Sequence, residues 1–350
     1  SSGVRFFYLT PGTTCKYTGR ISYCGIYDML SASQLESFAR DGFLVIEDVV
    51  DESSLQEVER EYTALLHQQA TRLFRHGLIS SDFAQYDFAQ RFARVVAEYP
   101  GCIDDMNISL PLVNDDIDPE RFHVHTGPAV FALLRHPAIL DIVEAVIGPE
   151  IASSPVQQVR IKPPMAGLVA DNISHSGVGI TTWHQDTVAV LPEADDTNQL
   201  TVWLAVTDAD EDNGCLVSIP GSHLEGSLRH EPGEIPREPS VARELIRGRR
   251  GRPLPVHRGG IIIFHKHNIH CSTPNRSNRL RWSFDLRYHP VGQASGRPAF
   301  PGFIARSREN PGAALTDPEA WSQIWRDARE RIIRGEYSGP IFKDWLAASI

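Results

Sequence analysis

Two segments that lie far apart in the chain place the strongest constraint on its fold. The first, residues 182–186, reads Thr-Trp-His-Gln-Asp, and the second, residues 264–272, contains His270. Side chains two positions apart in an extended strand point the same way, so His184 and Asp186 share one face. Two imidazoles and one carboxylate on a common face bind ferrous iron and leave coordination positions open. The sequence therefore predicts an iron site at His184, Asp186 and His270, formed by strands that pair across a long stretch of chain.

Short apolar segments separated by turn signals occupy the second half of the chain. Strands are expected at residues 156–161, 180–190, 200–206, 215–219, 261–264, 267–271 and 281–288. Asp212-Asn213-Gly214 is a turn signal between two of them. Many short strands with turns between them are typical of an antiparallel barrel or sandwich.

The first half of the chain shows helical periodicity instead. Ser31 and Gln34 form the pattern of a capping box, and residues 128–147 carry apolar side chains at helical spacing. Helices followed by strands favour a single domain, mostly β with flanking helices, around a double-stranded β-helix (jelly roll, cupin-like) core. The expected parts of this domain, residues 1–350, are an N-terminal arm (1–30), mainly helical support (31–150), the jelly-roll core with the metal site (151–290) and a C-terminal extension (291–350).

Composition narrows the classes of partner. The formal net charge of −10 argues against a nucleic-acid groove or an anionic membrane surface. No apolar run approaches the roughly 18–20 residues that span a bilayer. The five cysteines are scattered, which is typical of free thiols in a reducing compartment. We therefore expect a cytosolic protein that acts on a small molecule, and the sequence does not indicate its oligomeric state.

An arginine follows the second segment at a position where it could bind a carboxylate of a cosubstrate. A 2-oxoglutarate cosubstrate would chelate the iron through its keto-acid end and leave its far carboxylate buried. A buried carboxylate calls for a bidentate partner, and arginine suits this role better than lysine. Arg281, which follows a turn after His270, is the expected anchor, with Ser283 on the same strand face. Arg279 is the alternative anchor, and a solvated surface charge is the simpler interpretation of any one of the nearby arginines Arg276, Arg279 and Arg287.

Three motifs in the same order make the chain resemble the phytanoyl-CoA dioxygenase family of iron- and 2-oxoglutarate-dependent oxygenases. The resemblance runs from about Ser33 to Pro290. The motifs are Trp183-His-Gln-Asp186, Asn213-Gly-Cys-Leu-Val-Ser-Ile-Pro-Gly-Ser-His223 and His270-x-Ser272-x-Pro274-Asn275, with Arg281 and Arg287-Tyr288 after them. The pattern after His270 favours it as the ligand over its neighbours His265 and His267.

The resemblance implies a jelly-roll fold with iron at His184, Asp186 and His270. It also implies that 2-oxoglutarate contacts positions matching Gln158, Trp203, Ser272 and Arg281. Residues 70–125 and 166–179 match nothing that can be placed, so the organic substrate is not indicated.

The resemblance also bears on the reaction. Halogenating relatives carry Ala or Gly where this chain has Asp186, so hydroxylation or another oxidation of a C–H bond is expected. The expected cofactor set is Fe(II), 2-oxoglutarate and O₂, with succinate and CO₂ as co-products. Two alternatives stay open: a cupin-like metal enzyme that does not use 2-oxoglutarate, and a binding protein that keeps the fold without turnover.

Overall fold

The computed structural model describes residues 30–109, 124–164, 178–233 and 239–339. Its α-helices are α1 (Ala32–Asp41), α2 (Glu52–Arg75), α3 (Phe88–Glu98), α4 (Pro128–Leu134), α5 (Pro137–Ile147), α7 (Arg243–Ile246) and α8 (Pro318–Ile333). Its strands are β1 (Phe43–Ile46), β2 (Ile151–Ser153), β3 (Gln158–Lys162), β4 (Thr181–His184), β5 (Leu200–Ala205), β6 (Leu216–Ser218), β7 (His230–Pro232), β8 (Pro239–Val241), β9 (Arg252–Leu254), β10 (Ile261–His265), β11 (His270–Ser272), β12 (Arg281–Pro290) and β13 (Phe303–Arg306). Short 3₁₀ helices include η1 (Pro100–Met106), η2 (Asp186–Ala189) and η4 (Ser222–Glu225).

Two antiparallel sheets form the centre of the molecule. The large sheet has the order β1-β10-β5-β12-β2-β13, with β3 also paired to β12, and the small sheet has the order β4-β11-β6-β9. From β3 to β6, and again from β9 to β12, the chain passes from one sheet to the other at each successive strand. This alternation is the double-stranded β-helix, so the predicted jelly-roll fold is confirmed.

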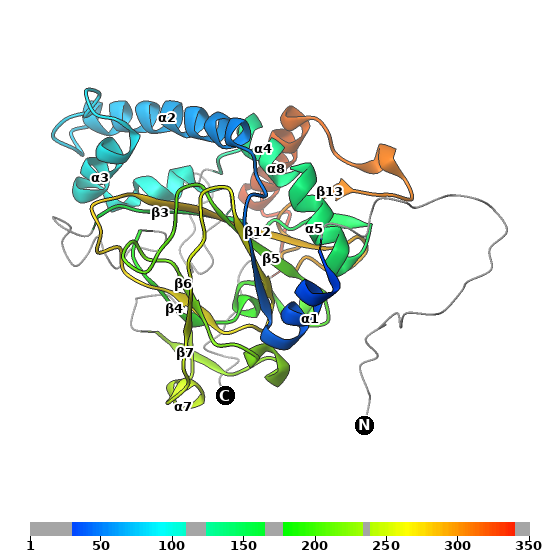
Figure 1. The fold of residues 1–350 in the computed structure, drawn as a ribbon. Coiled ribbons are helices and arrows are strands. Elements are labelled where there is room, and N and C mark those ends of the chain that lie inside the picture. The colour runs from blue at the N-terminus through cyan, green and yellow to red at the C-terminus, as the bar shows by residue number, and fades with distance from the viewer. Residues whose placement is uncertain (1–29, 110–123, 165–177, 234–238, 340–350) are drawn as a thin grey trace, which may run out of the picture.

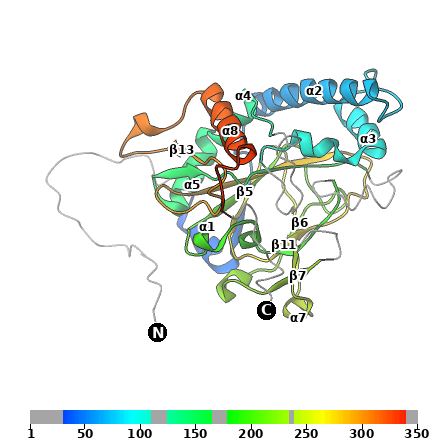
Figure 2. The same cartoon turned by 180° about the vertical axis from the view of Figure 1, so that it is seen from behind.

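Helices cover the large sheet on one side (Figure 1), and the view from behind shows α8 beside α4 and α5 (Figure 2). Local sequence determines where the first helices begin. Ser31 caps α1 through a complete capping box with Gln34, as predicted, and Asp51 caps α2 by accepting a hydrogen bond from Ser54 N (3.0 Å). Gly42 ends α1 at φ +79°, a conformation that glycine adopts without strain, and the chain turns directly into β1.

The long strand β12 separates two different environments. Its residues Trp282, Phe284, Leu286 and Tyr288 belong to one large apolar cluster with the helices. The intervening residues point to the other face, into the space between the two sheets; they are Arg281, Ser283, Asp285 and Arg287, and all four are buried. A strand that is apolar on its outer face and charged on its inner face is unusual, because buried charges are stable only with partners. The inner face of β12 therefore carries the buried charged residues that are typical of a functional site.

Three sequence-based predictions differ from the structure. The strand predicted at residues 180–190 ends at His184, and η2 follows. The strand predicted at 267–271 begins only at His270, because residues 266–268 turn after β10. The extension segment also contributes a strand, β13, which lies outside residues 151–290 but pairs with the large sheet; the strand expected from the apolar run at residues 43–50 is present as β1 and ends at Ile46. The single-domain division itself stays a prediction, and the N-terminal arm (1–30) falls almost wholly outside the described residues.

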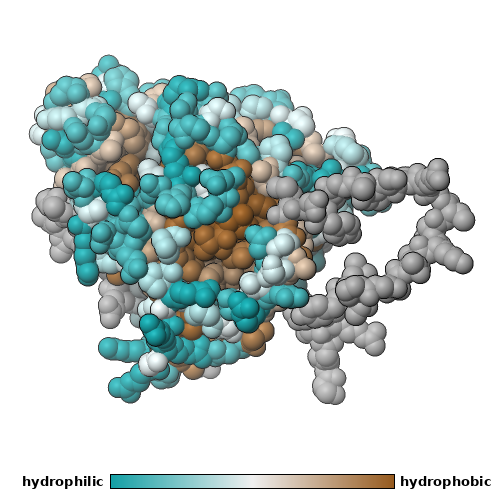
Figure 3. Space-filling model, viewed as in Figure 1, coloured by the Kyte–Doolittle hydropathy of each residue, from teal (hydrophilic) through white to brown (hydrophobic). Residues whose placement is uncertain are grey.

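The surface view shows apolar side chains gathered over the β1 region on the face of Figure 1 (Figure 3). Among the described residues, no helix combines the length and apolarity needed to cross a membrane. Cys102, Cys215 and Cys271 are buried free thiols, as expected, and the cytosolic location stays a prediction.

Candidate metal and cosubstrate site

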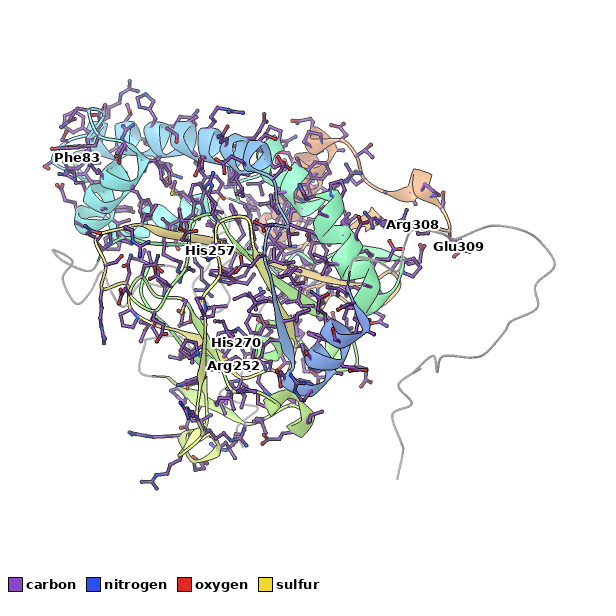
Figure 4. The ribbon with its side chains drawn as sticks, viewed as in Figure 1. Phe83, Arg252, His257, His270, Arg308 and Glu309 are labelled. Carbon is purple, nitrogen blue, oxygen red and sulfur yellow. The ribbon has the colours of Figure 1, made fainter. Side chains whose placement is uncertain are left out.

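The small sheet brings two distant histidines together. Strands β4 and β11 are antiparallel neighbours, and His184 lies directly opposite His270, with ring centroids 4.3 Å apart. Gln185 keeps an extended backbone (φ −110°, ψ 144°), so Asp186, the first residue of η2, still points to the same side as His184. One ligand atom from each of His184, Asp186 and His270 lies within 4.8 Å of the other two. The three predicted ligands therefore converge, and Figure 4 shows His270 inside the strand layers, away from surface residues such as Arg308.

Backbone carbonyls orient both imidazoles. His184 Nδ1 donates to Thr182 O (2.7 Å), and His270 Nδ1 donates to Asn268 O (3.1 Å). Because Nδ1 carries the proton in each ring, the lone pair is on Nε2, which is the form that binds a metal. Burial, reinforced by the neighbouring His270, lowers the pKa of His184 to about 4 and keeps this ring neutral at physiological pH.

The carboxylate of Asp186 is held at both oxygens. Thr201 Oγ1 donates to Oδ2 (2.7 Å), and the Arg287 guanidinium donates to Oδ1 in an ion pair that is almost completely buried. Burial alone would raise the pKa of Asp186, but the charge of Arg287 and the two histidines hold it well below its ordinary value. Arg287 is therefore a buried partner of Asp186, and the simpler interpretation as a solvated surface charge does not apply to it.

The predicted cosubstrate anchor is completely buried. Arg281 Nη1 donates to Ser283 Oγ (2.7 Å), while Nε and Nη2 have no hydrogen-bond partner among the described residues. Burial lowers the pKa of Arg281 to about 9, which still leaves it protonated at neutral pH. The guanidinium carbon lies 5.6 Å from the centroid of the Trp203 ring. Arg279, the alternative anchor, pairs with Asp210 and is half exposed, so the geometry favours Arg281.

A buried cation with two nitrogens that have no partner among the described residues is suited to bind one carboxylate of a dicarboxylic acid. An uncompensated guanidinium in a protein interior is costly, and a carboxylate can accept two parallel hydrogen bonds from it. The His184–Asp186–His270 donor set is likewise the one that suits Fe(II) with open positions. The residues present therefore fit both iron and 2-oxoglutarate.

The other two residues implied to contact 2-oxoglutarate have protein partners. Gln158 Oε1 accepts from Asn107 Nδ2 (2.7 Å). Ser272 Oγ accepts from Lys162 Nζ (2.7 Å) and from Thr181 N (2.9 Å). Both residues are buried, and their contacts with 2-oxoglutarate remain predictions.

A small cavity adjoins the three ligands. Its lining residues are His184, Asp186, His270, Trp203, Phe264, Leu216, Thr181, Thr201, Arg160, Asp285 and Arg287. Sequence reasoning missed Thr201, Arg160, Asp285 and the buried role of Arg287. One signal was present: charged and hydroxyl residues alternate with apolar ones along residues 281–288, which indicates a strand with a polar buried face.

The competing histidines lie apart from this group. His265 Nδ1 accepts from His267 N (3.1 Å), and the ring of His265 lies 5.1 Å from that of His223. Within the described residues, the one group with the spacing of a metal site is His184, Asp186 and His270.

The chain is similar in sequence and in fold to known proteins. Phytanoyl-CoA dioxygenase domain-containing protein 1 of Rattus norvegicus is 27% identical over 302 residues, covering 78% of this chain and 94% of the rat protein. Peroxisomal phytanoyl-CoA dioxygenase of Bos taurus is 22% identical over 268 residues, covering 75% of this chain and 69% of the bovine one. The solved structure of a non-heme monooxygenase, ThoJ in its apo form, shares the fold with a TM-score of 0.52 and 19% identity, covering 86% of this chain and 98% of its own.

The family comparison covers most of the protein. The model of the family described as Phytanoyl-CoA dioxygenase (PhyH) matches residues 38–283, well over half of the 350 residues. This range includes both histidines, Asp186 and the Arg281–Ser283 pair. The chain therefore belongs to the phytanoyl-CoA dioxygenase family of iron- and 2-oxoglutarate-dependent oxygenases.

Proposed function

We propose that this oxygenase hydroxylates a C–H bond of a small organic molecule, with succinate and CO₂ as co-products. His184, Asp186 and His270 would hold Fe(II), and Arg281 with Ser283 would bind the far carboxylate of 2-oxoglutarate. The observation that carries the proposal is the buried guanidinium of Arg281, in which two nitrogens have no partner among the described residues. It lies over Trp203, and Trp203 lines the cavity of the three metal-ligating residues. A metal enzyme that does not use 2-oxoglutarate would have no use for this cation.

Each of these residues has a physical task. When bound, iron and 2-oxoglutarate supply the oxidising power that O₂ alone lacks at a C–H bond. The carbonyls of Thr182 and Asn268 keep His184 and His270 in the metal-binding tautomer. Arg281 fixes one end of the cosubstrate, and the Trp203 wall and the buried interior exclude water from the cavity.

Asp186 supports hydroxylation over halogenation. A carboxylate at this position occupies the coordination site that a halide would otherwise take. Because Thr201 and Arg287 both hold the Asp186 side chain, it is not free to swing away from the ligand group.

The test is an anaerobic titration of the purified protein with Fe(II) and then 2-oxoglutarate, followed by visible absorbance. We expect the weak charge-transfer band of the iron–keto-acid chelate in the wild type. Arg281→Ala should retain Fe(II) binding but weaken 2-oxoglutarate binding by about 10- to 100-fold, since it removes a charge-assisted, bidentate contact. Arg279→Ala is the matched control and should behave like wild type. A folded, iron-loaded wild type without the band would contradict the proposal and favour a metal enzyme of another class.

A further inference from the structure

The residue between two of the proposed iron ligands is completely buried and polar. Gln185 stands between His184 and Asp186, and its extended backbone directs its side chain to the opposite face of the strand. The side chain is 0% exposed, and the cavity is lined by its two neighbours and not by Gln185 itself. A buried primary amide is stable only when its N–H and C=O groups are hydrogen-bonded, so its partners show which parts of the chain it connects.

The Gln185 amide makes three hydrogen bonds to main-chain atoms of two other segments. Nε2 donates to Gly226 O (2.8 Å) and to His267 O (2.7 Å), and Oε1 accepts from Leu228 N (2.8 Å). Two carbonyl oxygens and one N–H group thus face the amide, and they determine which of its ends is nitrogen. A carboxylate in this position would face two carbonyl oxygens without a donor, so the site specifies an amide.

The bond to His267 lies just beyond the point where the two ligand-bearing strands stop pairing. Strand β4 ends at His184 and β11 begins at His270, and these two residues are partners in the sheet. Residues 266–269 form a turn and an irregular segment between β10 and β11. The side chain of Gln185 therefore extends the link between β4 and β11 past the last strand pair, to a carbonyl three residues before the third ligand.

The same connection, residues 266–269, carries the group that orients the third ligand. Asn268 O accepts from His270 Nδ1 (3.1 Å), and this carbonyl directly follows the one that Gln185 binds. The next peptide is held from another element, because Ser222 Oγ accepts from Ile269 N (2.8 Å). The direction in which the His270 ring presents Nε2 therefore depends on how firmly the connection is held.

The main chain of Gln185 is held as well. Its N–H donates to His230 Nε2 (3.2 Å), and His230 Nδ1 donates to Leu228 O (2.9 Å). Residues 226–230 thus bind both the main chain and the side chain of Gln185. Because one peptide on each side joins this residue to His184 and Asp186, Gln185 is fixed relative to all three ligands.

A direct role for Gln185 in binding does not fit these contacts. Both N–H groups of the amide are used within the protein, and the side chain is buried outside the cavity. A purely structural role would lower the free energy of unfolding and leave the ring of His270 unchanged. A role in positioning would change the ring of His270 in a protein that is still folded.

We propose that Gln185 is a positioning residue of the iron site and acts through residues 266–269 on the orientation of His270. This inference rests on the proposed function and deepens it. It assigns the geometry of the third ligand to a side chain that touches neither the metal nor the cosubstrate.

The first measurement uses the metal-free protein, in which the nitrogen chemical shifts of the histidine rings report the tautomer of each ring at neutral pH. Gln185→Met fills a similar space without the hydrogen bonds and releases His267 O. The His270 signal should then move from the Nδ1–H form towards a mixture of both tautomers. His184 is the internal control and should keep its tautomer, because its acceptor, Thr182 O, lies on β4 itself.

The second measurement is the affinity for Co(II), followed by visible absorption. Gln185→Met should bind Co(II) about tenfold or more weakly, as is typical when a contact outside the ligand set is lost. If this variant does not fold, Gln185→Asn takes its place with the same expected results, because its amide is one methylene too short to reach all three partners.

The matched control is Asn213→Leu. Asn213 is also a buried amide, 1% exposed, and it links main-chain atoms of a different turn: Oδ1 accepts from Asp210 N (2.7 Å) and Nδ2 donates to Asp208 O (2.8 Å). Urea unfolding should show that both variants are destabilised, whereas the affinity for Co(II) should fall in the Gln185 variant alone.

Two results overturn the inference. In one, a folded Gln185 variant keeps either the wild-type signal of His270 or the wild-type affinity for Co(II). In the other, Asn213→Leu loses as much affinity, which would assign the loss to general destabilisation. Neither result touches the proposed function, because that function fails only if the wild-type iron–keto-acid band is absent.

Discussion

Each proposed iron ligand is held by a second contact that determines how it presents its donor atom. His184 and His270 donate to backbone carbonyls, and Asp186 accepts from Thr201 and Arg287. Such outer contacts set tautomer, orientation and charge before any metal binds. At the residue scale the centre is therefore prepared by hydrogen bonds from four different parts of the chain.

Arg287→Met should weaken metal binding without unfolding the protein. The variant leaves the buried carboxylate of Asp186 without its counter-charge, so its pKa rises towards that of a neutral acid and a proton competes with the metal. We expect the affinity for Co(II), measured by its visible absorption, to fall by about 10- to 100-fold. Thr201→Val, which removes the weaker of the two contacts, should have a smaller effect. An unchanged affinity in a folded Arg287→Met protein would show that the ion pair is structural.

At the scale of elements, the connection between β10 and β11 buries titratable groups without using them as ligands. Burial, followed by the charges of neighbouring groups, lowers the pKa of His265 to about 3 and that of His267 to about 4. Both rings are therefore neutral in the folded protein at physiological pH. The turn keeps them beside His223 and away from the metal ligands.

These two histidines make the metal-free protein sensitive to acid. Their pKa in the unfolded chain is near 6.5. Below that pH the unfolded state therefore binds protons that the folded state does not bind. The two neutral histidines make their full contribution to the free energy of unfolding above pH 6.5. This contribution is lost as the pH falls towards about 4, by about 1.4 kcal/mol per pH unit for each histidine. His265→Gln should therefore flatten the acid side of the stability profile, measured by urea unfolding with a chelator present.

The matched control for this experiment is His257→Gln. The His257 side chain is 81% exposed, and Figure 4 shows it on a different part of the molecule from His270. Its replacement should leave the slope of the acid side unchanged. A His265→Gln profile parallel to wild type would contradict the assignment of acid sensitivity to this connection.

At the scale of the whole molecule, the two largest apolar clusters of the described residues lie on opposite faces of the large sheet. The larger is the apolar cluster between the large sheet and the helices, and the smaller lies between the two sheets beside the site. Trp282 on β12 belongs to the first: its ring lies 5.1 Å from that of Tyr62 on α2 and 5.0 Å from that of Phe88 on α3. Helix packing thus supports the strand whose other face carries Arg281 and Ser283.

Trp282→Ala should destabilise the protein by about 3–5 kcal/mol, because it opens a cavity between the sheet and the helices. Trp282→Phe, which fills part of that space, should cost less. Urea unfolding measures both. Since the neighbouring residues on the opposite face keep their strand positions, 2-oxoglutarate affinity at low temperature should change far less than stability. A loss of affinity as large as that of Arg281→Ala would mean that the two faces of β12 are not independent.

Local sequence patterns were sufficient to predict the fold class and the site residues that now lie together. The capping box at Ser31 and the helices of residues 128–147 follow from short-range chemistry. The spacing of His184 and Asp186 placed both on one side, and the strand alternation after the turn at residues 274–278 placed Arg281 and Ser283 on a common face. These features depend on neighbours within a few positions, which a sequence displays directly.

The tertiary structure decided what depends on pairing between distant segments. The pairing of the strands of His184 and His270 was predicted, but other contacts follow only from sheet order and register. Thr201 and Arg287 hold Asp186, and Arg160 meets Asp285 beside the metal ligands. A single sequence contains the residues of each pair but not the pairing. An arginine is most often solvated, so only its burial against a named partner distinguishes a surface charge from part of a site.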